Sequence, residues 1–165
     1  VLYRMLCAAK KFNIRNFIST TGDNPFVDYF YAKKMIKYHL KKKFDFTEIQ
    51  GLSWGAFSYG VNLKALDKIV KNKKKKDTEV WGNYFRFNKK LNCGVYRINT
   101  KKYFHKDLRL TIDFKEDYEF AKQLLKSLKV NMPLSKDIIK IINKNKKLMN
   151  INKHKKQKKI PVKYY

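Results

Sequence analysis

Cysteine, histidine and long apolar runs are all scarce in this sequence, and each scarcity excludes a class of protein. Two cysteines and three histidines stand far apart among its 165 residues, which excludes a disulfide framework and a Cys/His metal cluster. No run approaches the roughly 18 uncharged apolar residues of a membrane-spanning helix, and no signal peptide is recognisable. We therefore expect a cytoplasmic protein with two reduced thiols, Cys7 and Cys93, and no membrane partner.

Acidic residues are also few, and the resulting charge raises the question of a nucleic-acid partner. Lys and Arg number 40 against 13 Asp and Glu, which gives a formal net charge of +27. Such an excess is typical of proteins that bind nucleic acid. Almost all of it is lysine, however, whereas base recognition and phosphate clamps favour arginine. A general compositional bias explains a Lys-, Asn- and Ile-rich chain equally well, so nucleic acid is not the partner that we favour, although the charge leaves it open.

The alternation of helical and strand-like patterns predicts an α/β fold. The expected helices are 2–12, 27–40, 63–70, 77–87, 115–128 and 138–148, and the expected strands are 16–20, 44–49, 52–61 (with a leading loop), 95–98 and 109–112. No glycine-rich phosphate loop is visible. We expect residues 1–130 to form the α/β domain, and residues 131–165 to form a helical extension that ends in a basic tail from residue 150.

Two groups of the scarce acids lie in contexts that suit a metal–nucleotide site. Residues 21–25, Thr-Gly-Asp-Asn-Pro, follow the first expected strand, and Asp113 follows the expected strand 109–112. Carboxylates at the carboxyl ends of strands are what a magnesium–nucleotide site in an α/β sheet requires. Each acid taken alone is better explained structurally: Asp23 as an Asx-type turn residue, and Asp113 as a helix N-cap with Glu116 at the capping-box position.

In order and spacing, these segments resemble the SpsF/NeuA-type cytidylyltransferases, which activate acidic or polysaccharide sugars. Residues 21–28, TGDNPFVD, are similar to the family's T-G-D-x-P-φ-φ-D signature, and residues 108–117, LRLTIDFKED, to its R-L-T-φ-D-x-x-E-D signature. Further similarities lie at 1–10, 55–66, 78–85 and 142–156. We expect the resemblance to correspond to the C-terminal two-thirds of the family only.

The resemblance implies a Rossmann-like, GT-A-like three-layer sandwich of the nucleotide-diphospho-sugar transferase type, with its N-terminal strand and phosphate-binding loop missing. It implies transfer of CMP from CTP to a sialic-acid-like or surface-polysaccharide sugar, with release of pyrophosphate. Asp23 and Asp113 would be the catalytic carboxylates that bind Mg²⁺, and Asp28, Tyr59 and Arg109 would contact the substrate. Arg109 could also orient Asp113. Both residues have structural interpretations as well: Asp28 as a surface acid in a first helical turn, and Arg109 as a surface ion pair at a strand edge. A homodimer is suggested by the resemblance as well.

Two departures from the family and two alternative functions accompany this interpretation. Ser19 stands where an Arg is common in the family, and Tyr59 where many members have a Glu, so the sugar specificity is open. Without the phosphate-binding loop, we expect the chain to be a fragment that is incomplete as an enzyme. One alternative is a Lys-rich RNA-binding protein of ribosomal type. The other is a divergent copy that keeps only the fold.

Overall fold

The computed structural model describes residues 1–74, 80–99 and 101–156, which combine a small sheet with helices. The α-helices are α1 (Leu2–Lys11), α2 (Tyr29–Lys42), α3 (Leu63–Asn72), α4 (Asn83–Arg86), α5 (Lys115–Ser127) and α6 (Ser135–Lys144). The strands are β1 (Asn16–Ser19), β2 (Phe46–Gln50), β3 (Tyr59–Asn62) and β4 (Cys93–Arg97), and two 3₁₀ helices are η1 (Lys101–Tyr103) and η2 (Lys146–Ile151). Each expected helix is present with shifted ends; of helix 77–87, residues 77–79 lie outside the described residues.

The strands form one mixed sheet in the order β1-β3-β2-β4. β3 is antiparallel to both β1 and β2, whereas β4 is parallel to β2. The register places Gly60 at the centre of the sheet, between Ile18 and Thr47. A Cβ at Gly60 would lie 2.9 Å from the His39 ring on α2, so the missing side chain allows this helix to pack closely on the sheet.

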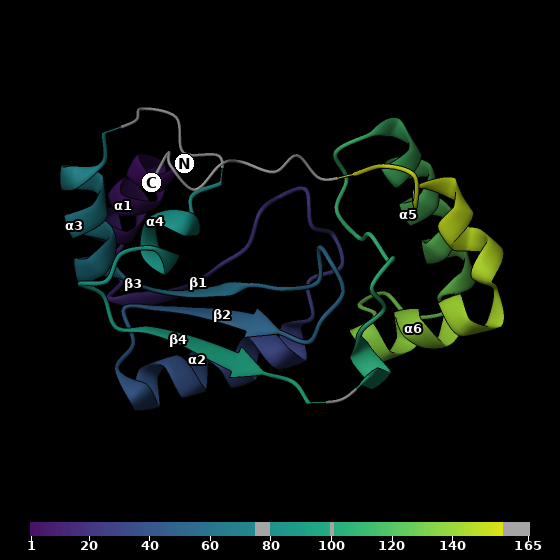
Figure 1. Ribbon diagram of the computed structural model, residues 1–165, viewed down its shortest axis with the longest axis horizontal. Helices are drawn as coiled ribbons and strands as arrows, with labels where there is room; N and C mark the ends of the chain where they lie inside the picture. The colour runs from purple at the N-terminus through teal and green to yellow at the C-terminus, as the bar shows by residue number, and fades with distance from the viewer. Residues whose placement is uncertain (75–79, 100, 157–165) are drawn as a thin grey trace.

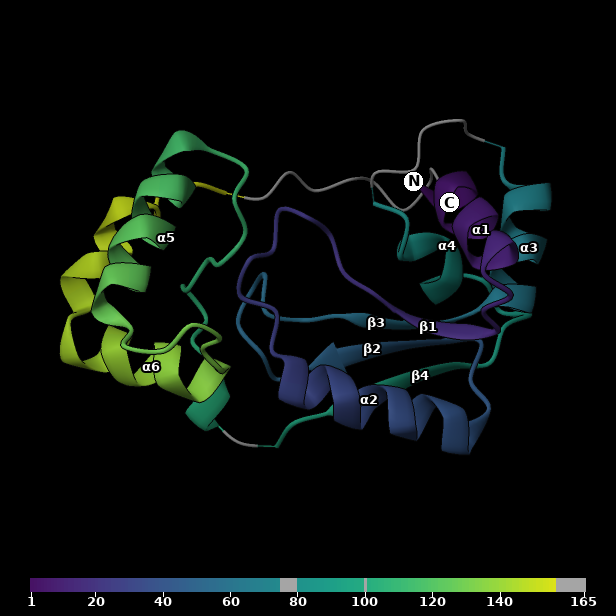
Figure 2. The same cartoon turned by 180° about the vertical axis from the view of Figure 1, so that it is seen from behind.

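Helices cover both faces of the sheet (Figure 1). α2 lies on one face and contacts all four strands. α1, α3 and α4 gather on the opposite face, as the view from behind confirms (Figure 2). α5 and α6 lie beyond one end of the strands. This arrangement confirms the predicted α/β architecture of three layers.

Two apolar cores hold these layers together. The core between the sheet and α1, α3 and α4 consists of Leu2, Leu6, Phe46, Val61, Ala65, Leu66, Ile69, Trp81 and Phe85. The other joins the start of α2 to α5 and α6, where Leu124 and Ile138 are both 0% exposed. The domain division at residue 130 stays a prediction, but helices on either side of that position share this second core.

The prediction of a strand at 109–112 is wrong, because these residues do not join the sheet. This segment meets the loop after β2 only through an isolated parallel bridge between Trp54 and Arg109. The Leu110 N–H donates to the Trp54 carbonyl, and the Ile112 N–H donates to the Asp23 carbonyl, both at 2.8 Å. Two separate loops therefore receive the hydrogen bonds that a sheet strand would give to one neighbouring strand. Of the expected strand 52–61, only residues 59–61 are strand, and β3 continues to Asn62.

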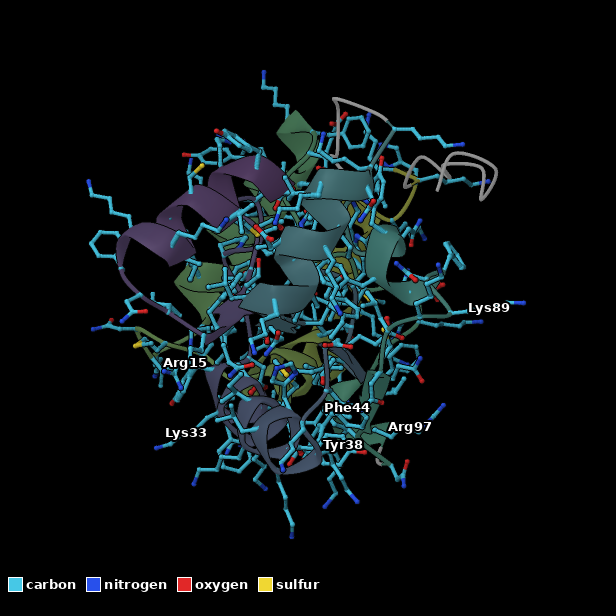
Figure 3. All side chains as sticks on the ribbon, turned by 90° about the vertical axis from the view of Figure 1, so that its left-hand side faces the viewer. Arg15, Lys33, Tyr38, Phe44, Lys89 and Arg97 are labelled. Atoms are coloured by element: carbon cyan, nitrogen blue, oxygen red, sulfur yellow. The ribbon has the colours of Figure 1, made fainter. Side chains whose placement is uncertain are left out.

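The excess of basic side chains lies mostly on the surface. Lys33, Lys89 and Arg97 are exposed and project from the periphery of the ribbon (Figure 3). In the described part of the chain, no helix combines the length and apolar character needed to cross a membrane. Of the expected basic tail, residues 157–165 lie outside the description. Its beginning is not a tail, because Asn152 is only 1% exposed and packs against the rest of the molecule.

Candidate active site

The turn after β1 presents the Asp23 side chain to solvent. Asn24, rather than Asp23, makes the local turn bonds: its Nδ2 donates to Thr21 Oγ1 at 2.9 Å, and its backbone N–H donates to the Thr21 carbonyl at 3.1 Å. In residues 1–74, 80–99 and 101–156, no hydrogen bond reaches the Asp23 carboxylate. The structural interpretation of Asp23 as the turn-forming side chain is therefore wrong, and its carboxylate is available to a ligand.

The segment that precedes Asp113 packs against this turn. The backbone bond from Ile112 to the Asp23 carbonyl joins the two segments one residue before Asp113. Gly55 makes room for this segment to cross the loop after β2, since its φ is +91° and a Cβ there would lie 2.5 Å from the Thr111 nitrogen. Glycine is needed at this point for both conformation and space. The loop after β2 thus determines where Asp113 lies relative to Asp23.

Arg109 is buried and holds Asp113 from behind. Its Nη2 pairs with Asp113 Oδ2, and its Nε lies 3.0 and 3.1 Å from the two carboxylate oxygens of Asp117. The Asn152 amide donates to Asp117 Oδ1 at 2.9 Å and to the Arg109 carbonyl at 3.1 Å. Arg109 is 6% exposed and Asp117 1%, so water screens these charge-assisted bonds very little. The network orients the Asp113 side chain.

Asp113 is not the N-cap that the sequence predicts. The cap position of α5 is Phe114, one residue later, and the acid three residues beyond it is Asp117. Asp117 accepts from the backbone N–H groups of Asp113 and Phe114 at 3.0 and 3.1 Å. Glu116 instead pairs with Lys155 at 2.8 Å. Because the helix starts one residue late, the Asp113 carboxylate lies outside it.

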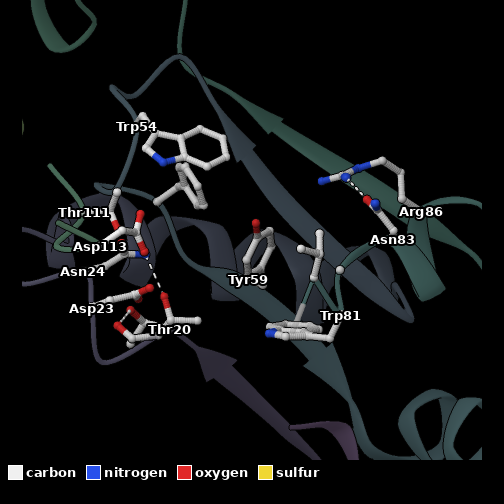
Figure 4. Close-up of a pocket in the computed structure, with 14 residues that line it drawn as sticks. Thr20, Asp23, Asn24, Trp54, Tyr59, Trp81, Asn83, Arg86, Thr111 and Asp113 are labelled. Carbon is white, nitrogen blue, oxygen red and sulfur yellow. Dashed lines mark hydrogen bonds between the residues drawn. The ribbon is translucent and has the colours of Figure 1, made fainter. Parts of the chain in front are cut away.

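Asp23 and Asp113 lie at one end of the same pocket, which has a volume of about 190 Å³ (Figure 4). Beyond them, aromatic side chains form the middle of the pocket, and Asn83 and Arg86 stand at the far end. Its lining consists of Thr20, Thr21, Asp23, Asn24, Trp54, Phe57, Tyr59, Val80, Trp81, Gly82, Asn83, Arg86, Thr111 and Asp113. A shallower depression of about 520 Å³ shares Asp23 and Trp81 and continues along α1. The structure thus brings together the two carboxylates that the sequence paired.

Tyr59 stands between the two ends of the pocket. Its ring stacks on Phe46 at 5.4 Å and meets the edge of Trp81 at 5.1 Å. Burial raises the pKa of the Tyr59 hydroxyl, and the positive charge of the Arg86 guanidinium offsets part of that effect. The hydroxyl is therefore a neutral hydrogen-bonding group at neutral pH. Its role toward a substrate stays a prediction.

Arg86 is a pocket residue that sequence reasoning missed. Its Nε and Nη2 lie 2.9 and 2.6 Å from Glu48 Oε2 on β2, and its Nη1 donates to Asn83 Oδ1. A usable signal was present, because arginine is rare in this lysine-rich chain and Arg86 follows the aromatic run 81–85. The partner Glu48 lies 38 positions earlier, however, and only the fold brings it to Arg86.

Two of the predicted substrate contacts, Asp28 and Arg109, do not line the pocket. Asp28 is 1% exposed; its Oδ1 accepts from the Tyr31 N–H at 3.1 Å, and its Oδ2 accepts from the Ser135 N–H at 2.9 Å. It caps α2 and ties this helix to α6, so both oxygens are engaged within the protein. Arg109 contacts Asp113 rather than the pocket. The geometry gives Asp28 a structural role and agrees with the interpretation of Arg109 as a residue that orients Asp113, while a substrate contact by either residue stays a prediction.

The donor set at the carboxylate end suits a hard cation. Asp23 and Asp113 supply carboxylates, and threonine hydroxyls lie beside them. Within the described residues, no group of three or more His, Cys, Asp or Glu side chains forms a complete metal cage. Mg²⁺ commonly takes only one or two protein carboxylates and keeps water and phosphate oxygens as its other ligands. The residues present therefore fit Mg²⁺ bound together with a phosphorylated ligand.

Comparisons with known proteins agree with the fold and with the two signatures. A sequence profile described as cytidylyltransferase matches residues 1–160. An uncharacterised protein of Methanocaldococcus jannaschii is 30% identical over 160 residues, and SpsF of Bacillus subtilis, a spore coat polysaccharide biosynthesis protein, is 29% identical over 133. A cytidylyltransferase structure from Leptospira borgpetersenii has a TM-score of 0.80 at 23% identity, over 90% of this chain and 64% of that one.

These matches cover most of this chain but a smaller share of each relative. They cover 96% and 78% of this chain, but the chain spans only 65% and 55% of the length of the two curated relatives. We expected the resemblance to be confined to the C-terminal two-thirds of the family. The profile match corrects this, since it runs through nearly all of the chain. With that match over residues 1–160, this chain belongs to the cytidylyltransferase family.

Proposed function

We propose that this chain forms the metal- and sugar-binding part of a cytidylyltransferase, which transfers CMP from CTP to a sugar and releases pyrophosphate. The observation that carries the proposal is the pocket with Asp23 and Asp113 at one end and an aromatic middle. The family name and the description of SpsF as a polysaccharide biosynthesis protein support the same chemistry. The sugar would be sialic-acid-like or a component of a surface polysaccharide.

The proposed reaction is an in-line displacement at phosphorus. The sugar hydroxyl oxygen forms a bond to the α-phosphorus of CTP, the bond from that phosphorus to the bridging oxygen breaks, and pyrophosphate leaves while the hydroxyl proton is lost. Negative charge is spread over the phosphate oxygens in the transition state. Asp23 and Asp113 would hold Mg²⁺, which when bound neutralises that charge and orients the phosphates. Arg109 would keep Asp113 in its binding orientation.

The middle of the pocket is suited to the sugar. Trp54 is 46% exposed at its rim, where its ring meets Phe57 edge-on at 5.3 Å. Exposed aromatic faces pack well against the C–H faces of sugar rings, while the Tyr59 hydroxyl and the Asn83 amide offer hydrogen bonds. A sugar placed here would lie between the carboxylates and Arg86, next to the phosphates held at the other end.

Binding of CTP tests the proposal directly. We expect CTP to quench the tryptophan fluorescence in the presence of Mg²⁺ and much less in its absence. Asp23→Asn and Asp113→Asn should each weaken Mg²⁺-dependent CTP binding by about tenfold or more, because each removes a carboxylate ligand. In an enzyme that turns over, the same substitutions should lower pyrophosphate release by orders of magnitude.

Asp107→Asn is the matched control, since Asp107 is an exposed acid of the same connecting segment that does not line the pocket. It should bind CTP as the native chain does. The proposal would be ruled out if CTP binding were independent of Mg²⁺, or if both pocket variants bound CTP with native affinity. The predicted homodimer and cytoplasmic location stay predictions, and no observation on the fold or the relatives favours the RNA-binding alternative.

A further inference from the structure

The far end of the pocket carries a positive charge that is already neutralised. Arg86 is the basic side chain among the described residues that line the pocket. Its Nε and Nη2 both bind one oxygen of Glu48, and the salt bridge is 2.6 Å long. The Glu48 side chain is only 14% exposed, and its other oxygen accepts from Gln50 Nε2 at 3.0 Å. Both partners are held, so the pair presents no net charge to the pocket.

The third nitrogen of the Arg86 guanidinium, Nη1, is also engaged within the protein. It donates to Asn83 Oδ1. A carboxylate that entered this end would have to displace Glu48 or approach the guanidinium beside Glu48's own negative charge. Both routes cost free energy, because Glu48 cannot move into water without leaving its bond to Gln50.

The geometry points to an uncharged sugar as the ligand of this end, with Arg86 as the residue that determines specificity. This inference rests on the proposed function. Of the two sugar classes proposed there, it keeps the surface-polysaccharide component, as a neutral ring whose hydroxyls meet Tyr59, Asn83 and Arg86, and excludes an acidic, sialic-acid-like sugar. The aromatic walls formed by Trp54 and Trp81 pack on its apolar faces. Glu48 does not touch the sugar. It sets the preference by cancelling the charge of Arg86.

The sequence supplies a direct readout for this end of the pocket. The chain has two tryptophans, and both Trp54 and Trp81 line the pocket. Intrinsic tryptophan fluorescence therefore reports on ligands bound there. Three sugar pairs that differ only at C6 serve as probes: glucose and glucuronate, galactose and galacturonate, mannose and mannuronate. Each is titrated into the chain with Mg²⁺ and CTP present.

We expect the native chain to bind at least one neutral sugar, and to bind it about fivefold or more tightly than its uronate partner. Glu48→Gln should reverse the order, because the amide is close to the same size and still accepts from Arg86 but leaves its charge uncompensated. Glu119→Gln removes an acid from α5, outside the pocket, and should leave the preference unchanged.

Three results would overturn the inference: tighter binding of the uronates by the native chain, binding of none of the six sugars, or an unchanged preference in Glu48→Gln. The same titrations also distinguish a failure of this inference from a failure of the proposed function. Mg²⁺-dependent CTP binding without the expected sugar preference contradicts only the inference. Sugar binding without Mg²⁺-dependent CTP binding contradicts the proposed nucleotide chemistry instead.

Discussion

At the scale of single residues, the described structure uses buried side-chain networks to orient exposed groups. Asp113 has an exposed carboxylate, but Arg109, Asp117 and Asn152 behind it are almost wholly buried. A carboxylate on a flexible segment would adopt many directions, and binding a cation would have to restrict it. Held by Arg109, the Asp113 side chain is already restricted before any ligand arrives. Asn152 matters because it joins Asp117 to the backbone of Arg109.

Asn152→Ala should therefore affect both folding and the site. Loss of the amide leaves the Arg109 carbonyl and an Asp117 oxygen without these donors in a buried place, which should lower the free energy of unfolding by about 1–3 kcal/mol. Mn²⁺ binding measured by electron paramagnetic resonance should weaken as well, because Asp113 is held less firmly. The control Asn150→Ala changes an exposed residue of η2, the 3₁₀ helix that ends just before Asn152, and should do neither. Native stability in Asn152→Ala would show that the network is unimportant.

His39 predicts a dependence of stability on pH. It is 0% exposed; Nδ1 lies 2.9 Å from Thr47 Oγ1, and Nε2 lies 3.2 Å from Asn16 Oδ1. Burial lowers the pKa of His39 below its ordinary value of 6.5, and Asp45 offsets part of this. Between the lowered pKa and 6.5, the His39 side chain binds a proton in the unfolded chain but not in the folded chain. The His39 contribution to stability is therefore complete above pH 6.5 and is lost as the pH falls toward the lowered pKa.

Urea unfolding between about pH 7.5 and pH 5 measures this effect. The native chain should lose stability across the interval, and His39→Gln should lose less because it has no imidazole to titrate. Lysine partners hold the pKa of Asp67 and Glu116 below their usual values, so these acids titrate at lower pH than the interval. Parallel curves for the two proteins would contradict the buried, neutral state of His39.

At the scale of elements, the loop after β2 and the segment 108–113 act as one unit. Gly55 lets their backbones meet, and the crossing places Asp113 beside the turn that carries Asp23. The prediction of a strand at 109–112 failed for a physical reason. The segment is extended and buried, with Leu110 and Thr111 at 2% and 4% exposure, but its hydrogen bonds go to loops. Residue types indicate that a segment is buried but do not tell which partner receives its backbone hydrogen bonds.

Gly55→Ala should disrupt this unit. A side chain at φ +91° is strained, and its Cβ would overlap the Thr111 nitrogen, so the free energy of unfolding should fall by about 1–3 kcal/mol. CTP binding should weaken in parallel because Asp113 moves relative to Asp23. Gly22→Ala is the matched control: a Cβ there meets nothing within 4 Å. Equal stability of the two variants, measured by urea unfolding, would show that the close crossing is not required.

At the scale of the whole molecule, the layered fold and the pairing of Asp23 with Asp113 could be predicted from the sequence. These followed from amphipathic helices and from two signatures that are local in sequence. The capping role of Asp28 and the place of Arg86 in the pocket did not follow, because each depends on a distant partner: Ser135 for Asp28 and Glu48 for Arg86. Only the folded chain brings such partners together. The net charge of +27 played no part in placing the site.

The central claim is that Asp23 and Asp113 hold one cation together, and a double-mutant cycle of Mn²⁺ affinity tests it most directly. Electron paramagnetic resonance counts free Mn²⁺ in the presence of CTP for the native chain, Asp23→Asn, Asp113→Asn and the double variant. If both carboxylates bind the same ion, each single substitution should weaken binding by about tenfold or more, and the double variant should be far less affected than the product of the two losses. Strictly independent effects, or native affinity in the double variant, would contradict a shared metal site.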